Sequence, residues 1–297
     1  MYHSMFTIAI TITIMTILLV IILSRRNPFI AFKIIWESRK EKKLWIHFAI
    51  MGVILLINKL ELKIEDNFIH IGDYSHIFQR YEGQLLANFQ DFLNYSWLTE
   101  ITTFFYIIIF VTLISTSFVL YFIQQDKHLF YTFIYAIGLN YLIAIPFYLF
   151  LPVNEVWYVH NQVSFLIPEV YPEFETQYRN VSGLNNCFPS LHNSISLTLL
   201  FLSYKSNNRP FKWVMTGSVG IIMFSTIDLG IHWLTDMAAG VILAITAFTL
   251  ANLISSVVTK PAGIKEKMAA NLVFIKKESV KRRLRWFSFP CFIIFVQ

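Results

Sequence analysis

Charged residues are scarce in this 297-residue chain: Asp, Glu, Lys and Arg make up 14%, whereas hydrophobic residues make up 56%. Soluble domains usually carry about 25% charged residues. The composition therefore excludes an ordinary soluble domain and indicates a membrane protein. Cysteine is almost absent, because the chain has only Cys187 and Cys291. We expect no disulfide and no redox chemistry, since the topology argued below places the two cysteines on opposite sides of a membrane.

The sequence also lacks nucleic-acid-binding motifs, internal repeats and low-complexity segments. A net charge of +6 is compatible with nucleic acid, but the basic residues flank apolar segments, so membrane topology explains the charge better. The first apolar run, 6–24, has no basic segment before it and no small-residue cleavage site after it. These absences favour a retained membrane helix over a cleaved signal peptide.

Apolar segments long enough to form helices recur along the chain. The second and fifth contain 15 and 14 residues, a length that also suits interfacial or re-entrant helices. If all segments cross and the N-terminus is outside, all but four of the 24 basic residues lie inside, as the positive-inside rule requires. Omitting one short span would reverse the topology of the chain after it and put basic loops outside. We therefore predict seven spans: 6–24, 44–58, 101–124, 129–151, 191–204, 213–231 and 234–258.

The predicted fold is all-α, a polytopic membrane helical bundle of about seven transmembrane helices. We divide it into an N-terminal helix with a basic inner loop (1–43), a membrane-embedded catalytic domain (44–258) and a basic inner tail (259–297) that suits an anionic inner leaflet. Segment 59–100 alternates apolar and charged residues. It is interpreted either as amphipathic helices at the outer interface or as a simple connecting loop. Segment 152–189, with several prolines and aromatics, predicts an irregular outer lid.

Two polar clusters lie at the edges of apolar spans, where charge is costly without a purpose. One is Asn-Asn-Cys-Phe-Pro-Ser-Leu-His over 185–192, and the other runs from Ser225 to Asp236. His232 and Asp236 are four residues apart and share a helix face. The carboxylate can then accept a proton from one imidazole nitrogen and leave the other free to attack.

The first cluster predicts a helix N-terminus, because Pro189 and Ser190 favour the start of a helix. Two helix N-termini on the same side favour an anion such as phosphate. This arrangement predicts nucleophilic catalysis through a phosphohistidine. His232 would attack phosphorus, Asp236 would orient it, His192 would act as acid and then as base, and Ser190 would hold phosphate oxygens.

The motifs Pro-Ser-x-His and Ser-x6-His-x3-Asp resemble the signatures of the type 2 phosphatidic acid phosphatase superfamily, Pro-Ser-Gly-His and Ser-Arg-x5-His-x3-Asp. The resemblance covers about 95–258. It implies a six-helix core, to which 6–24 adds an N-terminal helix. It also implies His232 as nucleophile, Asp236 as its partner, His192 as proton donor, and no metal or other cofactor.

The chain departs from that family pattern at the phosphate-binding positions. Leu191 replaces the usual Gly, Thr226 replaces the usual Arg, and no Lys-x6-Arg-Pro signature precedes the first cluster. Arg179 is the best replacement, as the nearest outer basic residue with a guanidinium that can grip phosphate in two-pronged fashion; its alternative role is a solvated loop charge. Asn186 and Thr226 complete the expected substrate site, and Asp228 either orients His232 or repels phosphate.

The sequence Phe-Pro-Ser-Leu-His at 188–192 is similar to the inositol phosphorylceramide synthase branch of the superfamily and its prokaryotic relatives. Segment 151–158, which contains Trp157, resembles that branch's lid, so Trp157 joins the expected substrate site. This resemblance implies transfer of a phospho-headgroup between lipids.

We therefore expect an integral protein of the cell membrane that acts on a phospholipid or polyprenyl phosphate, with an extracytoplasmic site, a cytoplasmic tail and no nucleic-acid partner. A simple lipid phosphate phosphatase is the first alternative, because it differs from a phosphotransferase only in using water as the acceptor. A non-enzymatic lipid transporter and a non-catalytic relative are the second and third. A metal site built from the two histidines and the aspartate is the fourth.

Overall fold

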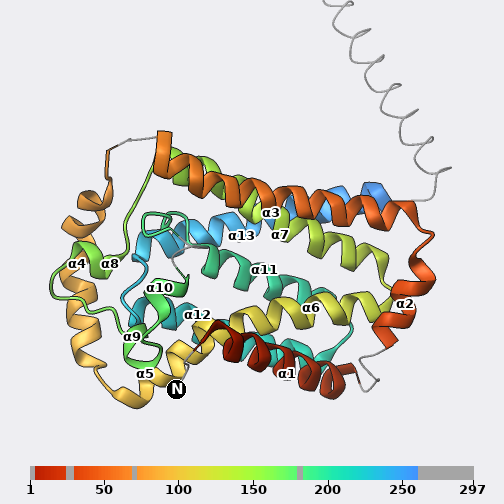
Figure 1. Cartoon of the computed structure of the whole chain (residues 1–297), viewed down its shortest axis with the longest axis horizontal. Coiled ribbons are helices and arrows are strands. Elements are labelled where there is room, and N and C mark those ends of the chain that lie inside the picture. The colour runs from red at the N-terminus through yellow and green to blue at the C-terminus, as the bar shows by residue number, and fades with distance from the viewer. Residues whose placement is uncertain (1–3, 25–29, 69–71, 179–182, 260–297) are drawn as a thin grey trace, which may run out of the picture. The chain divides into compact units, whose positions relative to one another are not determined.

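The computed structural model describes residues 4–24, 30–68, 72–178 and 183–259 (Figure 1). The chain divides into a unit of Met1–Ser255 and a second unit of Ser256–Gln297. Everything below concerns the first unit and the end of its last helix. The predicted tail, with Cys291, lies outside the described residues, and so does Arg179.

The described residues are helical apart from turns and one isolated parallel bridge between Val153 and Asn186, which confirms the all-α prediction. A π-helical turn, η1 (Phe105–Ile109), joins two of the helices into one continuous rod. The α-helices are α1 (Met5–Ser24), α2 (Ile30–Ser38), α3 (Lys42–Phe68), α4 (Ser75–Phe92), α5 (Ser96–Phe104), α6 (Phe110–Gln124), α7 (Lys127–Phe150), α8 (Val156–Val159), α9 (Ile167–Val170), α10 (Phe174–Tyr178), α11 (Leu191–Lys205), α12 (Arg209–Asp228) and α13 (Leu234–Thr259).

Four helical segments of the described chain are long and apolar enough to cross a membrane: Met5–Ser24, Ser96–Gln124, Lys127–Phe150 and Leu234–Thr259. They indicate an integral membrane protein. The other three predicted spans correspond to α3, α11 and α12, which are not among these four. The number seven therefore stays a prediction, although every predicted span coincides with a helix.

Side chains near the helix starts explain several boundaries. The carboxylate of Asp126 accepts a hydrogen bond from the backbone N–H of Leu129 at 3.0 Å and opens α7. Asn208 does the same for Phe211 at 3.1 Å and opens α12, with Pro210 in the first turn. Such caps satisfy N–H groups that a helix start leaves without partners.

Most of segment 59–100 is helical, so its interpretation as a simple connecting loop is wrong. Its first ten residues, 59–68, continue α3, because no Gly or Pro interrupts the helix there. The next helix, α4, is amphipathic: Gly83, Leu86, Ala87 and Gln90 are buried, while most of its other residues are exposed or half-buried. The structure does not place α4 relative to a membrane, so its interfacial position stays a prediction.

The long helices pack side by side, and the short helices α8, α9 and α10 gather at one end of them, opposite α2 (Figure 1). Helix α11 packs on α12, α7 and α6, while α1 packs on α6 and α3 on α7. We call α4 together with residues 152–178 the cap. The starts of α11 and α13 and the end of α12 lie at the same end as the cap (Figure 1).

An apolar cluster holds the cap on the bundle. Leu86 and Ala87 of α4 pack with Val153, Val156 and Val163, and the same cluster includes Cys187 and Trp233. Segment 152–178 is irregular apart from three short helices, as predicted, and its role as an outer lid stays a prediction. The cap therefore covers both polar clusters identified in the sequence.

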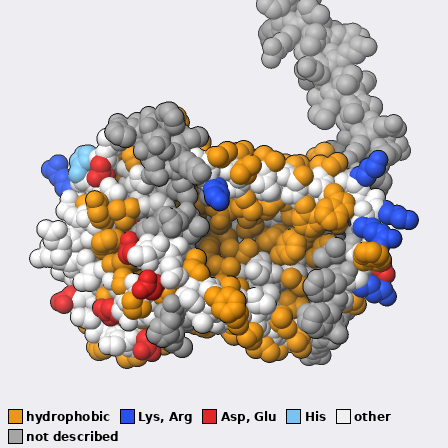
Figure 2. Space-filling view, viewed as in Figure 1, with side chains coloured by type: hydrophobic (Ala, Val, Ile, Leu, Met, Phe, Trp, Pro, Cys, Tyr) orange, Lys and Arg blue, Asp and Glu red, His pale blue; other side chains and the backbone are white. Residues whose placement is uncertain are grey.

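Charge is distributed unevenly along the bundle. Figure 2 shows a group of Lys and Arg side chains at the end where α2 lies, and most Asp and Glu side chains at the cap end. Exposed basic residues of the described chain include Arg39 and Lys40, which follow α2, and Lys42, Lys127 and Arg209, which open α3, α7 and α12. The site residues lie at the acidic end.

Candidate active site

The turn between α12 and α13 carries His232. Helix α12 ends because Gly230 adopts a φ of +75°, a left-handed conformation that favours glycine. The carbonyl oxygen of Thr226 accepts hydrogen bonds from the backbone N–H groups of Ile231 (3.2 Å) and His232 (3.1 Å). The backbone on both sides of the imidazole is therefore fixed by the last turn of α12.

Asp236 reaches back from the first turn of α13 to this imidazole. Its Oδ2 lies 3.4 Å from Nδ1 of His232 and accepts a hydrogen bond from the backbone N–H of Trp233 at 3.0 Å. His232 is 5% exposed and Asp236 is fully buried. The 3.4 Å contact is longer than the usual hydrogen bond, as catalytic contacts often are before substrate binds. Asp236 therefore caps α13 and orients His232 at the same time.

His192 lies across from this pair at the start of α11. Its ring stacks on Tyr106 at a centroid distance of 4.1 Å and contacts Phe110 at 4.4 Å. The ring centroids of His192 and His232 are 6.5 Å apart. Tyr106 belongs to the π-helical turn η1 and Phe110 directly follows it, and such turns often occur at functional sites. Within the described residues the His192 ring makes no hydrogen bond, so aromatic contacts alone hold it there.

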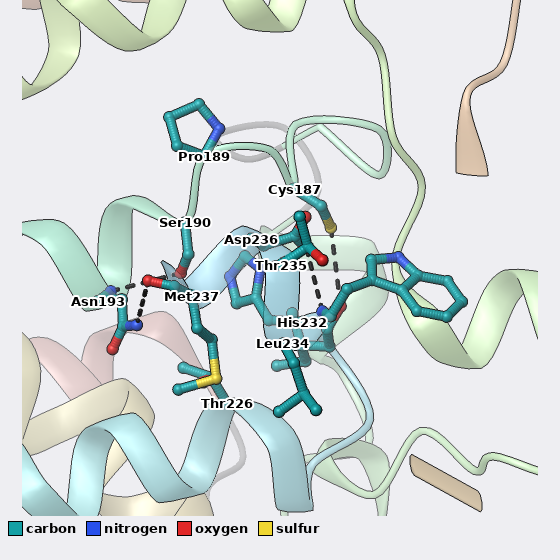
Figure 3. A network of polar contacts seen from close by, with 12 residues as sticks. Cys187, Pro189, Ser190, Asn193, Thr226, His232, Leu234, Thr235, Asp236 and Met237 are labelled. Atoms are coloured by element: carbon teal, nitrogen blue, oxygen red, sulfur yellow. Dashed lines mark hydrogen bonds and ion pairs between the residues drawn. The ribbon is translucent and has the colours of Figure 1, made fainter. Parts of the chain in front are cut away.

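The two polar clusters are joined by hydrogen bonds between α11 and α13 (Figure 3). The backbone N–H of Ser190 donates to the carbonyl oxygen of Asp236 at 3.2 Å, and Asn193 Nδ2 donates to that of Met237 at 3.1 Å. The close approach requires Gly240, where an added Cβ would lie 2.8 Å from the Ser190 carbonyl oxygen. Two clusters 40 residues apart in the sequence thus form one site.

A family model described as the PAP2 superfamily matches residues 76–250, more than half of the chain. The chain belongs to the PAP2 superfamily. No curated protein and no solved structure matched the chain. Membership confirms the family expected from the motifs and indicates phosphatase or phosphotransferase chemistry on lipid phosphates.

In this PAP2 protein, the side chains of Ser190 and Thr226 both form hydrogen bonds with backbone groups of helices α11 and α12. The Ser190 side-chain oxygen accepts a hydrogen bond from the backbone N–H of Asn193 and caps α11, as its position before a helix predicted. The Thr226 hydroxyl donates to the carbonyl oxygen of Met223 within α12 at 2.8 Å. Both side chains are fully buried beside the histidine pair. Their role in holding phosphate stays a prediction.

The remaining predicted residues lie in or beside the cap. Asn186 is half-buried, and its Oδ1 has no hydrogen-bond partner among the described residues. The Trp157 indole donates to Glu155 at 2.5 Å and stacks on Phe165 at 4.8 Å, so its ring is built into the cap. Asp228 accepts a hydrogen bond from Thr102 at 2.8 Å, which ties α12 to α5.

The polar face of α4 also contributes to the site and was not predicted. Glu82 accepts hydrogen bonds from the backbone N–H groups of Leu234 (2.6 Å) and Thr235 (3.1 Å) and from the Thr235 hydroxyl, and so caps α13 from another helix. Gln90 donates to the carbonyl oxygens of Asp228 and Ser164, both at 2.9 Å. The signal was present as helical spacing of polar residues around buried Leu86 and Ala87.

Proposed function

We propose that this PAP2 protein breaks phosphate esters of lipids through a phosphohistidine on His232. The observation that carries the proposal is the placement of two imidazoles 6.5 Å apart, one of them paired with Asp236. Catalysis needs a contact of about 3–3.5 Å from one nitrogen to phosphorus and a hydrogen bond of about 2.6–3.2 Å from the second imidazole. From the 6.5 Å between the ring centroids we infer that one phosphate group can contact both imidazoles.

The first half-reaction forms the covalent intermediate. Nδ1 of His232 faces Asp236, so Nε2 carries the lone pair that attacks phosphorus. The N–P bond forms as the ester P–O bond breaks, and the leaving oxygen takes a proton from protonated His192. Asp236 stabilises the positive charge that develops on His232 during attack.

In the second half-reaction His192 accepts a proton instead of donating one. An acceptor hydroxyl gives its proton to His192 while its oxygen attacks phosphorus and the N–P bond breaks. Water as acceptor makes the protein a lipid phosphate phosphatase, and an alcohol makes it a phosphotransferase. We propose transfer to a lipid or polyol hydroxyl, supported by the similarity of 188–192 and 151–158 to the inositol phosphorylceramide synthase branch.

We propose Arg179 and Asn186 as substrate contacts, together with Ser190 and Thr226, and Trp157 as part of the lid. Asn186 supports this role best, because its Oδ1 is buried without a partner in the described part of the chain. A ligand hydroxyl would satisfy that oxygen. In this proposal Arg179 supplies the positive charge that is missing because Thr226 replaces the usual Arg.

We propose that the site faces the extracytoplasmic side of the cell membrane. The support is the charge distribution: the basic group at the opposite end fits a cytoplasmic face under the positive-inside rule. The substrate then reaches the site from the outer leaflet, and the tail from 259 lies inside.

Acid-quenched and base-quenched reactions with a phosphate-labelled phospholipid test the mechanism on the purified full-length chain. We expect base-stable, acid-labile label on the wild-type protein and none on His232→Ala. His192→Ala should slow the first half-reaction, measured as release of the leaving group in the first turnover, by about 10²–10⁴-fold for an alkyl phosphate. The loss in that step should be much smaller for an aryl phosphate, whose leaving group needs no proton. The matched control, His76→Gln, changes an exposed histidine of α4 and should behave as wild type.

Label retained on His232→Ala, or equal losses in the first half-reaction for both substrates in His192→Ala, would contradict the assigned roles. The acceptor is tested in the same assay with and without added lipid or inositol-like alcohols. Labelled transfer product supports the phosphotransferase. Release of free phosphate alone identifies a phosphatase. A folded His232→Ala variant without turnover supports an enzyme, either phosphotransferase or phosphatase. A non-enzymatic transporter would keep moving lipid after this substitution.

A further inference from the structure

We propose that Cys187, His232 and Asp236 form an inhibitory site for a thiophilic divalent cation, with zinc as the best match. One ligand atom from each residue lies within 4.8 Å of those of the other two, and all three side chains are buried. Figure 3 shows the three side chains gathered at the turn before α13. Cation binding rests on these residues alone, whereas inhibition rests also on the proposed function.

The distances suit zinc. Zinc bonds of about 2.3 Å to sulfur and 2.0–2.2 Å to nitrogen and oxygen place tetrahedral ligand atoms roughly 3.3–3.6 Å apart. Nδ1 of His232 and Oδ2 of Asp236 are already 3.4 Å apart. Closing the site therefore requires Cys187 to move by about 1 Å toward the pair.

Asp236 supplies an independent indication of a missing ligand. Its Oδ1 is buried and has no hydrogen-bond partner among the described residues, although the residue is fully shielded from solvent. An unpaired carboxylate oxygen is costly to bury, and a cation bound to Oδ2 offsets that cost by neutralising the carboxylate. Hard cations such as Mg²⁺ do not suit a thiolate, so the donor set selects a softer ion.

Cys187 is held in place by the backbone rather than by a flexible loop. Its N–H donates to the carbonyl oxygen of Val153 at 3.2 Å, next to the parallel bridge that pairs Val153 with Asn186. Its Sγ lies 3.7 Å from the carbonyl oxygen of Ile231, the residue before the nucleophile. The thiol therefore stays beside His232, although the proposed reaction gives it no part.

Cation binding and phosphohistidine formation exclude one another. A cation on Nδ1 takes the lone pair of that nitrogen, so the single ring proton moves to Nε2. Nε2 is the nitrogen that must attack phosphorus, and once protonated it has no lone pair to offer. The thiol releases its proton on binding, and no oxidant or reductant is needed. A chelator reverses the inhibition.

Cobalt titration of the purified full-length chain in detergent tests the site without any assay of turnover. We expect one equivalent of Co²⁺ with a thiolate-to-metal charge-transfer band in the near ultraviolet, and displacement of that band by Zn²⁺. Cys187→Ser should lose the band and most of the affinity. Cys291→Ser, the matched control, should keep both. Absence of the band in the wild type, or equal binding by Cys187→Ser, would overturn the site.

Inhibition is then measured on the same variants with a labelled lipid phosphate. Zn²⁺ should abolish wild-type turnover and chelation should restore it, whereas Cys187→Ser should keep wild-type turnover and lose the sensitivity. Zinc binding through Cys187 without inhibition would overturn the inhibitory role. If no substrate is turned over, the proposed function fails while the cobalt band still decides the metal site.

Discussion

Replacing Glu82 by alanine tests whether the cap positions the start of α13 and, through Asp236, the proposed nucleophile His232. The Glu82 carboxylate accepts hydrogen bonds from two backbone N–H groups and one hydroxyl at the start of α13. Loss of a helix cap costs about 0.5–2 kcal/mol, and loss of a negative charge at a helix N-terminus costs about 0.3–1 kcal/mol. We therefore expect Glu82→Ala to lower the free energy of unfolding by about 1–3 kcal/mol.

Turnover should fall as well, because α13 starts two residues before Asp236. A displacement of about 1 Å at a reacting group can cost 10²-fold in rate. We expect Glu82→Ala to lower kcat by about 10–100-fold and to change KM little, since Glu82 orients a partner and touches no substrate in the proposed reaction. Glu82→Gln, which keeps one acceptor oxygen, should fall between alanine and wild type.

Thermal unfolding in detergent and steady-state turnover of a lipid phosphate check this expectation. Asp91→Ala is the matched control, because Asp91 is an exposed carboxylate on the same helix. Equal behaviour of Glu82→Ala and Asp91→Ala in both measurements would refute the reasoning. A rise in KM alone would also refute it, because it would make Glu82 a substrate contact.

Three further substitutions test other parts of the site. Gly230→Ala should destabilise the protein by more than about 1 kcal/mol in thermal unfolding, because φ is +75° and its Cβ would lie 2.6 Å from the Ser164 carbonyl oxygen; near-wild-type stability would refute this. Thr102→Val should cost about 1–3 kcal/mol, because it removes the donor at 2.8 Å from buried Asp228; Thr102→Ser should recover most of that loss. Tyr106→Leu should lower kcat by up to about tenfold, because it removes the ring stacked on His192, the proposed proton donor, whereas Tyr106→Phe, which keeps the ring, should lower kcat less.

The sequence predicted what depends on local spacing. The contact of His232 with Asp236 was expected from their spacing of four residues, but the predicted shared helix face is wrong, because His232 lies in the turn before α13. The start of α11 follows from Pro189 and Ser190. The predicted spans match helices because apolar runs dictate helices in a membrane. These features need no knowledge of distant contacts.

Contacts between distant segments were not predictable in the same way. Glu82 and Leu234 are 152 residues apart, and nothing in either segment indicates that α4 lies over the start of α13. Thr226 was assigned to phosphate by its position in the motif, yet its hydroxyl donates to its own helix, as Thr hydroxyls inside helices commonly do. The contact of His192 with Tyr106 depends on a π-helical turn that apolar periodicity does not reveal.

The two histidines are held by different forces, and the difference suits their proposed roles. His232 is fixed by backbone hydrogen bonds and by a carboxylate that specifies one tautomer, as a nucleophile with one attacking nitrogen requires. His192 is held by stacked aromatic rings. A hydrogen bond to either nitrogen would favour one protonation state, whereas a ring face accepts imidazole by stacking and imidazolium by cation–π attraction. In the proposed reaction His192 donates a proton and then accepts one in each turnover, so imidazole and imidazolium must occupy the same position. The aromatic contacts stabilise both forms there.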